Sequence, residues 1–157
     1  MNKIIAGILS FLLWIMPWST GIYNAHARFA FDKNAAWNRI VCCVENNDTA
    51  TLVSIASPLL KSSVADLSDQ IAQMLGLIDR DYTRITNSTA GTYQDSGIYG
   101  VELVLSFVYA DTLRTLVVDY DVTNSKNKND VGISRIQLFK GRYADPDFAV
   151  LADIRIP

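Results

Sequence analysis

Three side chains in the second half of the chain have the types needed for acid–base chemistry. Glu102 and Asp121 are carboxylates on neighbouring predicted strands, and Arg135 lies on the next strand. Paired carboxylates act as general acid and base when burial shifts their pKa values. On a solvated sheet face the same residues form only a cross-strand ion pair of small energetic weight. We expect the solvated arrangement, a surface polar row, and assign no catalytic residue.

Other catalytic and metal-binding patterns are incomplete. The single histidine, His26, lies in a segment expected to be removed on export, which excludes a Ser-His-Asp triad, a Cys-His pair and histidine metal sites. From Asp119 to Asp130 the spacing of acidic and amide residues partly matches that of a calcium-binding loop. Asn124 and Asp130, however, stand where an EF-hand loop has glycine and a bidentate glutamate. We therefore expect no metal and no cofactor.

Two adjacent cysteines, Cys42 and Cys43, lie on the first predicted helix of the exported domain. Exported proteins often form disulfides, but helical geometry points neighbouring side chains apart. We expect two free thiols, with an intermolecular bond through Cys42 as the alternative.

Aromatic residues are frequent enough to line a pocket between helices and sheet. The alternative is that they fill the core, as aromatic side chains usually do. The pocket candidates include Trp37, Met74, Phe107, Tyr109 and Tyr120, and Tyr82, Tyr93 and Tyr99 share the same pattern.

Helical periodicity dominates the first half of the exported domain. Asp32 is a suitable N-cap for a helix over 33–46, and Asp48 for a second helix that Pro58 ends or restarts. A third helix is predicted over 64–78, where apolar residues recur at helical spacing.

β-branched and aromatic residues dominate after Asp79 and predict four strands, at 82–93, 98–109, 113–123 and 132–140. Near the C-terminal end of the sequence, Asp145 and Pro146 suggest the start of a short helix. A segment of mixed apolar and polar residues follows from Phe148 to Ile156. The domain is thus α+β, with three N-terminal helices packed on a curved four-stranded antiparallel sheet.

Alternation along the strands predicts a register. A turn centred on Asp111 and Thr112 places Leu103 opposite Tyr120 and Glu102 opposite Asp121. Tyr120 would then face the core, and Asp121 would point into solvent beside Arg135.

The N-terminus has the features of a secretory signal. Lys3 precedes an uncharged apolar stretch that Pro17 ends, and Ala25-His26-Ala27 is a small-x-small cleavage pattern. The apolar run is short for a membrane span, so a retained helix is the lesser alternative and membrane contact is expected only through an uncleaved signal. We expect a signal peptide over 1–27, one domain over 28–157, and an exported product. The formal net charge of −2 argues against nucleic-acid partners.

The helix opening at 63–71, SVADLSDQI, and the segment 129–136, NDVGISRI, resemble a bacterial family of cell-surface proteins, the domain of unknown function 5104. The resemblance covers about residues 33–141. It implies a nuclear-transport-factor-2-like, or cystatin-like, cone fold and an extracytoplasmic location. It does not imply any catalytic activity.

Two classes of function are consistent with these observations. The first is a non-catalytic extracytoplasmic module that binds an unknown protein or small ligand. The second is an isomerase- or hydrolase-type enzyme of the cone fold, with Glu102 or an aspartate as its base. The missing histidine and the expected outward carboxylates favour the first.

Overall fold

A computed structural model describes residues 33–142 and 148–156, and four helices come first among them. The carboxylate of Asp48 accepts the backbone N–H of Thr51 at 2.9 Å, and the hydroxyl of Ser57 accepts that of Leu60 at 3.1 Å. Pro58 occupies the first turn after Ser57 and starts a separate helix. The structure therefore has four helices among the described residues, where the sequence predicted three. The helices are α2 (Lys33–Asn46), α3 (Thr49–Ile55), α4 (Pro58–Ser63) and α5 (Leu67–Gly76).

The first predicted helix is confirmed at 33–46, whereas the third, predicted at 64–78, forms only over 67–76. Asp66 explains its late start, because this residue adopts a left-handed conformation with φ of 52° immediately before α5. The predicted signal peptide, the Asp32 cap and the Asp145–Pro146 helix start lie outside the described residues.

Five antiparallel strands form one sheet in the order β1-β2-β3-β4-β5. The fifth strand corrects the prediction of four, since the mixed run of the tail pairs with β4. The sequence of β5 shows little alternation of apolar and polar residues, because only one of its residues, Ile154, has to be buried. The strands are β1 (Arg84–Asp95), β2 (Ile98–Val108), β3 (Leu113–Asn124), β4 (Gly132–Lys140) and β5 (Ala149–Arg155).

The predicted register is wrong by two residues between β2 and β3. Leu103 pairs with Val118, and Glu102 pairs with Asp119 where Asp121 was expected. The centre of the turn lies one residue earlier than predicted, because the N–H of Tyr109 donates to the carbonyl of Thr112 at 3.0 Å and leaves Ala110 and Asp111 at the tip. A shift of two residues leaves every side chain on the same face, so apolar alternation could not detect it.

The register between β3 and β4 is shifted in the same way, and a bulge between Asp119 and Tyr120 shifts it by one more residue. Asp119 therefore pairs with Arg135, and Tyr120 pairs with Ile133 where Ile136 was predicted.

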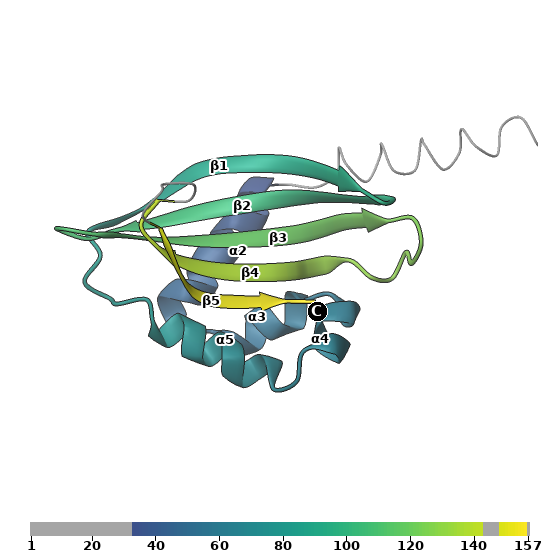
Figure 1. Cartoon of the computed structure of the whole chain (residues 1–157), viewed down its shortest axis with the longest axis horizontal. Coiled ribbons are helices and arrows are strands. Elements are labelled where there is room, and N and C mark those ends of the chain that lie inside the picture. The colour runs from purple at the N-terminus through teal and green to yellow at the C-terminus, as the bar shows by residue number, and fades with distance from the viewer. Residues whose placement is uncertain (1–32, 143–147, 157) are drawn as a thin grey trace, which may run out of the picture. The chain divides into compact units, whose positions relative to one another are not determined.

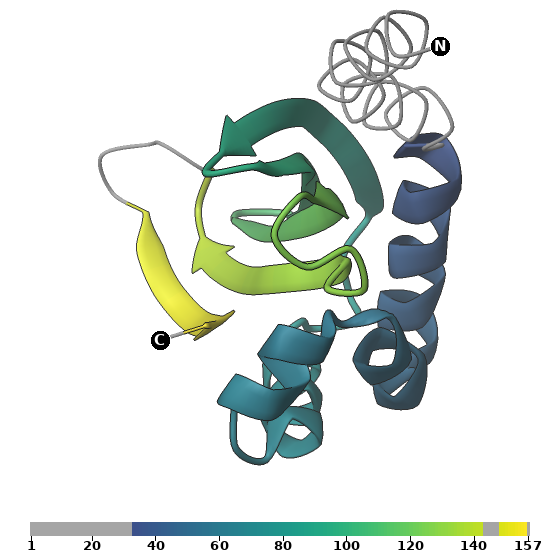
Figure 2. The same ribbon diagram turned by 90° about the vertical axis from the view of Figure 1, so that its right-hand side faces the viewer.

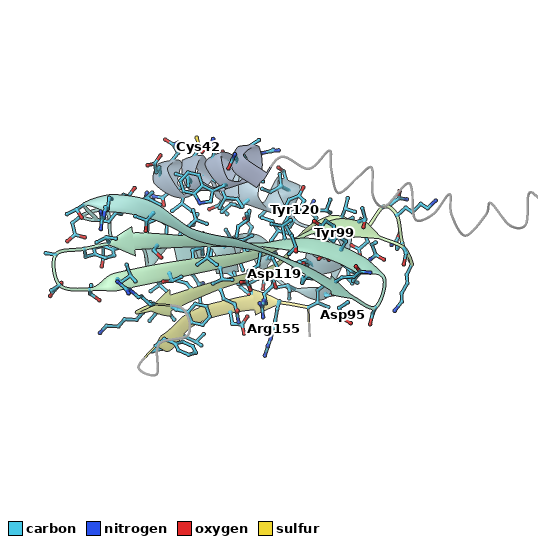
Figure 3. The ribbon with its side chains drawn as sticks, turned by 90° about the horizontal axis from the view of Figure 1, so that it is seen from above. Cys42, Asp95, Tyr99, Asp119, Tyr120 and Arg155 are labelled. Atoms are coloured by element: carbon cyan, nitrogen blue, oxygen red, sulfur yellow. The ribbon has the colours of Figure 1, made fainter. Side chains whose placement is uncertain are left out.

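One face of the sheet packs against the helices, and this is the main core. Figure 1 shows α2 behind the sheet and the three shorter helices along β4 and β5. Tyr120 lies on the α2 side in Figure 3, as predicted, although it is only half-buried. The most deeply buried residues here include Ile40, Leu52, Leu60, Ile71, Leu75, Leu103, Leu105, Leu116, Ile133 and Ile136.

The opposite side of the sheet, which carries Val104, Val117, Asp119 and Phe139, is named the open face. No helix covers it in the part of the chain that the structure describes (Figure 1). The sheet curls strongly in the end-on view of Figure 2, and every pair of neighbouring strands contains a register shift. Bulges increase twist and bend strands, so the irregular pairing accounts for the curl.

Candidate functional site

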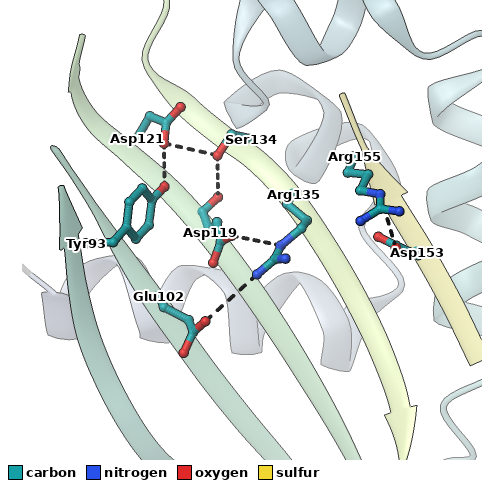
Figure 4. Close-up of polar contacts among 8 residues, drawn as sticks. All are labelled: Tyr93, Glu102, Asp119, Asp121, Ser134, Arg135, Asp153 and Arg155. Carbon is teal, nitrogen blue, oxygen red and sulfur yellow. Dashed lines mark hydrogen bonds and ion pairs between the residues drawn. The ribbon is translucent and has the colours of Figure 1, made fainter. Parts of the chain in front are cut away.

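Six polar residues from four adjacent strands meet on the open face (Figure 4). Four strands contribute because side chains of neighbouring strands lie within contact distance on the same face. This polar cluster consists of Tyr93 on β1, Glu102 on β2, Asp119 and Asp121 on β3, and Ser134 and Arg135 on β4.

One half of the cluster is an ion-pair row. Arg135 Nε lies 2.8 Å from Asp119 Oδ2, and an Arg135 guanidinium nitrogen lies 3.9 Å from Glu102 Oε2. The three side chains are 16–29% exposed, so they are only partly solvated. The second oxygen of Asp119 is buried and has no hydrogen-bond partner among the described residues. Burial raises the pKa of Asp119; Arg135 opposes this rise and Glu102 adds to it.

The other half of the cluster is built around Asp121. Its Oδ1 accepts the Tyr93 hydroxyl and also the Ser134 hydroxyl, the latter at 3.1 Å. Burial raises the pKa of Asp121 above its ordinary value, although both hydrogen bonds favour the ionised form. Burial, followed by the contact with Asp121, also raises the pKa of Tyr93.

The predicted surface row of Glu102, Asp121 and Arg135 therefore needs correction. Glu102 and Arg135 do lie together, but Asp119 stands between them, as the register shift requires. Asp121 is 7% exposed and so is not a solvated residue. Its partners are Tyr93 and Ser134.

Tyr93 reaches Asp121 across an intervening strand because Gly100 leaves room for its ring. A Cβ placed on Gly100 would come within 2.1 Å of Tyr93 Cζ. Sequence reasoning missed the roles of Tyr93 and Ser134. A glycine inside a strand is the one available signal, since it often marks a close approach of other groups.

The other end of the open face is apolar. Val104, Val117 and Phe139 form a small buried cluster. The ring of Phe148 meets that of Phe139 edge-on, with centroids 5.3 Å apart. Phe148 and Val150 are 40% and 55% exposed, so the apolar surface continues outward at β5.

The predicted pocket residues do not gather in one place. Met74 and Phe107 are fully buried, and Trp37 and Tyr120 are half-buried. Tyr82 packs edge-on against Phe107 and Tyr109 at centroid distances of 5.5 Å and 6.4 Å.

An open hollow of about 530 Å³ lies at the β2–β3 turn, distant in the strands from the polar cluster. Of the five pocket candidates only Tyr109 lines it, together with Arg84, Asp111 and Arg142. Four of its nine lining residues are exposed: Arg84, Ala110, Asp111 and Arg142.

Asp119 and Asp121 belong to β3, and within residues 33–142 and 148–156 no three Asp, Glu, His or Cys side chains are grouped to hold a metal. Cys42 is exposed and Cys43 is buried, and no disulfide joins the two within the described residues.

No helix within the described ranges is long and apolar enough to cross a membrane. No protein-family model matches the chain, and no curated protein is significantly similar to it.

Proposed function

We propose that this chain is a non-catalytic extracytoplasmic binding module that contacts a partner protein through its open face. The supporting observation is the apolar surface at β5, where Phe148 and Val150 remain exposed beside the buried Phe139. Apolar side chains next to polar groups are typical of surfaces that bind other proteins.

The polar cluster supports binding more than catalysis. A working base needs an oxygen that a substrate proton can reach. Asp121 is buried with Oδ1 already accepting two hydroxyls, and Asp119 is paired with Arg135. Fixed charges beside an apolar patch instead give orientation and selectivity to a protein contact.

The second candidate is an isomerase- or hydrolase-type enzyme with a carboxylate base. The raised pKa values of Asp119 and Asp121 favour it, because perturbed carboxyls concentrate at active sites. Glu102 is the most accessible of the three carboxylates, with 28% of its side chain exposed.

We further propose that the chain is exported and that its fold is the cone implied by the sequence resemblance. N-terminal helices followed by an antiparallel sheet support the nuclear-transport-factor-2-like, or cystatin-like, assignment and the resemblance to family 5104. Intact-mass measurement of the protein recovered outside the cytoplasm tests the address. A mature chain that begins at Arg28 supports export, and a mass that retains residues 1–27 contradicts cleavage.

Site-specific photocrosslinking tests the binding surface. A photoreactive residue replaces Val150 in the full chain, and the matched control carries it at Gln70, which is exposed on α5. We expect a discrete protein adduct from position 150 and none from position 70, and Phe148→Asp should reduce its yield about tenfold, as loss of an apolar anchor does. Equal adducts at both positions, or none, would contradict the proposal.

A further inference from the structure

The contact between Tyr93 and Asp121 joins an edge strand to the middle of the sheet. β1 pairs only with β2, so it is one edge of the five-stranded order. Tyr93 pairs with Gly100 in the β1–β2 ladder, and Gly100 pairs with Asp121 in the β2–β3 ladder. The tyrosine hydroxyl thus spans one complete strand to reach its acceptor.

We propose that Tyr93, laid across Gly100 onto Asp121, is a proton-dependent latch that holds the end of β1 closed in mild acid and releases it as the pH rises. The latch does not depend on what the open face binds, so it is independent of the proposed function.

The surroundings of Asp121 are mostly acidic. Ser134 is a neutral donor, and Arg135 is the one cationic member of the polar cluster, already paired with Asp119. The titratable and charged groups that face Asp121 from the elements around it are Tyr93 on β1, Glu102 on β2, Asp119 on β3, Asp130 in the loop before β4, and Arg135 on β4.

Closure and protonation favour one another because closure removes Asp121 from water, and this burial outweighs the Tyr93 hydrogen bond, which by itself favours the ionised form. A buried carboxylate loses its hydration, whereas a protonated carboxyl loses little. Opening at the end of β1 would rehydrate the ionised form, and ionisation of Tyr93 at still higher pH acts in the same direction. Both groups therefore make opening easier as the pH rises.

The end of β1 pairs regularly with β2 as far as Asp95, and the register shift between Tyr99 and Gly100 lies one ladder further in, between β2 and β3. Bulges interrupt ladder pairing, and the hairpin residues Ser96 and Gly97 that follow both have positive φ angles. Edge strands with few tertiary contacts open at low free-energy cost. A single buried hydrogen bond can then control the local opening equilibrium.

Hydrogen exchange of the full chain tests the latch. Amide opening constants, corrected for the intrinsic exchange rate, are measured for residues 92–95 and for the internal reference 103–107 between about pH 5 and about pH 8. One linked proton changes an opening constant by up to about tenfold per pH unit between its two pKa values. We expect opening of 92–95 to increase with pH over this range, and that of 103–107 to change much less.

Three variants separate the causes. Asp121→Asn keeps an acceptor oxygen but cannot titrate, so the pH dependence of 92–95 should disappear. Tyr93→Phe should increase opening at both pH values, whereas Asp111→Asn, a control at the exposed β2–β3 turn, should behave as the wild type.

Persistence of the pH dependence in a folded Asp121→Asn variant would overturn the latch. If that variant does not fold, the wild-type comparison decides alone. An equal increase in opening at 92–95 and 103–107, or no increase at 92–95, overturns the proposal, because the effect would then be global or absent.

Discussion

Tyr93 and Gly100 are so close that the ring occupies the space of a missing side chain. A Cβ on Gly100 would lie 2.1 Å from Tyr93 Cζ and 2.3 Å from its hydroxyl oxygen. Gly100 is itself buried in β2, so the ring has no free space on the strand into which it can shift. The hydrogen bond from Tyr93 to Asp121 thus depends on a residue that contributes no atoms to it.

Gly100→Ala should therefore displace Tyr93 and cost about 1–3 kcal/mol of folding free energy, the usual range for overpacking a buried site. Gly91→Ala is the matched control in the adjacent strand, where the added Cβ would meet only the Glu102 Cβ at 3.9 Å. That change should be neutral or stabilise by about 0.4–1 kcal/mol through the unfolded chain. Urea unfolding midpoints measure both. Equal effects of the two substitutions would contradict the close contact.

The stability of the whole domain should decrease from mild acid toward neutral pH. The folded protein raises the pKa values of Asp119 and Asp121, so these carboxyls bind protons more tightly folded than unfolded. Their contribution is complete below the ordinary aspartate pKa of about 3.9 and is lost as the pH rises through the raised values. Urea midpoints between about pH 4.5 and pH 8 test the direction.

Asp121→Asn is the control for this dependence, since it removes one of the two titrating groups and keeps the shape of the side chain. The midpoint should then vary less with pH than in the wild type. A midpoint that rises toward neutral pH in the wild type would show that groups with lowered pKa values, such as Asp48, dominate instead.

The sequence predicts the helices and most strands because their signals are local. The Asp48 cap and the apolar stripe of α5 act within a few residues. β5 was missed because its exposed edge position demands little alternation, with Ile154 alone fully buried. The faces predicted for β2 and β3 agree with the observed pairing as far as Asp121, whereas the predicted partners do not, because a slip of two residues preserves the alternation.

The polar cluster depends on features that no local pattern encodes. Asp119 replaces Asp121 in the ion-pair row because the turn after Tyr109 is centred one residue earlier than expected. The partnership of Tyr93 with Asp121 further requires a glycine on the strand between them. Both are tertiary relationships, so three members of the cluster, Glu102, Asp121 and Arg135, were predictable and their pairing was not.

Cys42 and Cys43 should differ sharply in reactivity. Cys42 is exposed, whereas Cys43 is 3% exposed and burial raises the pKa of its thiol, which lowers its thiolate fraction. Alkylation of the native full chain without reductant should label Cys42 rapidly and Cys43 only after denaturation. Labelling of neither thiol before reduction, with a mass two hydrogens short, would instead indicate a bond between them.

Arg80 should stabilise the end of α2. Its guanidinium donates to the carbonyl oxygens of Val44 at 2.7 Å and Glu45 at 3.0 Å in the last turn of α2, where the Val44 carbonyl also accepts the N–H of Asn47 at 3.2 Å. A cation at a helix C-terminus also interacts favourably with the helix dipole, so Arg80→Ala should cost about 1–2 kcal/mol. Arg39→Ala, at an exposed position on α2, should change stability by less than about 0.5 kcal/mol. Comparable losses in the two variants would contradict a capping role.

Gly132 should be the least replaceable glycine in the described chain, because both conformation and space require it. Its φ is 127°, and an added Cβ would lie 2.6 Å from the carbonyl oxygen of Ile55, a backbone atom that cannot rotate away. Here the start of β4 meets the α3–α4 junction, where the N–H of Ser57 donates to the carbonyl of Ile133 at 2.8 Å. Gly132→Ala should therefore separate the helices from the sheet and cost about 2–4 kcal/mol.

Gly76→Ala is the matched control for Gly132→Ala, since nothing lies within 4 Å of the added Cβ at the end of α5. Alanine favours helix over glycine, so this variant should gain up to about 1 kcal/mol. Urea midpoints of the two variants should move in opposite directions from the wild type. A Gly132→Ala midpoint equal to that of the wild type would mean that β4 and the α3–α4 junction are not in contact in solution.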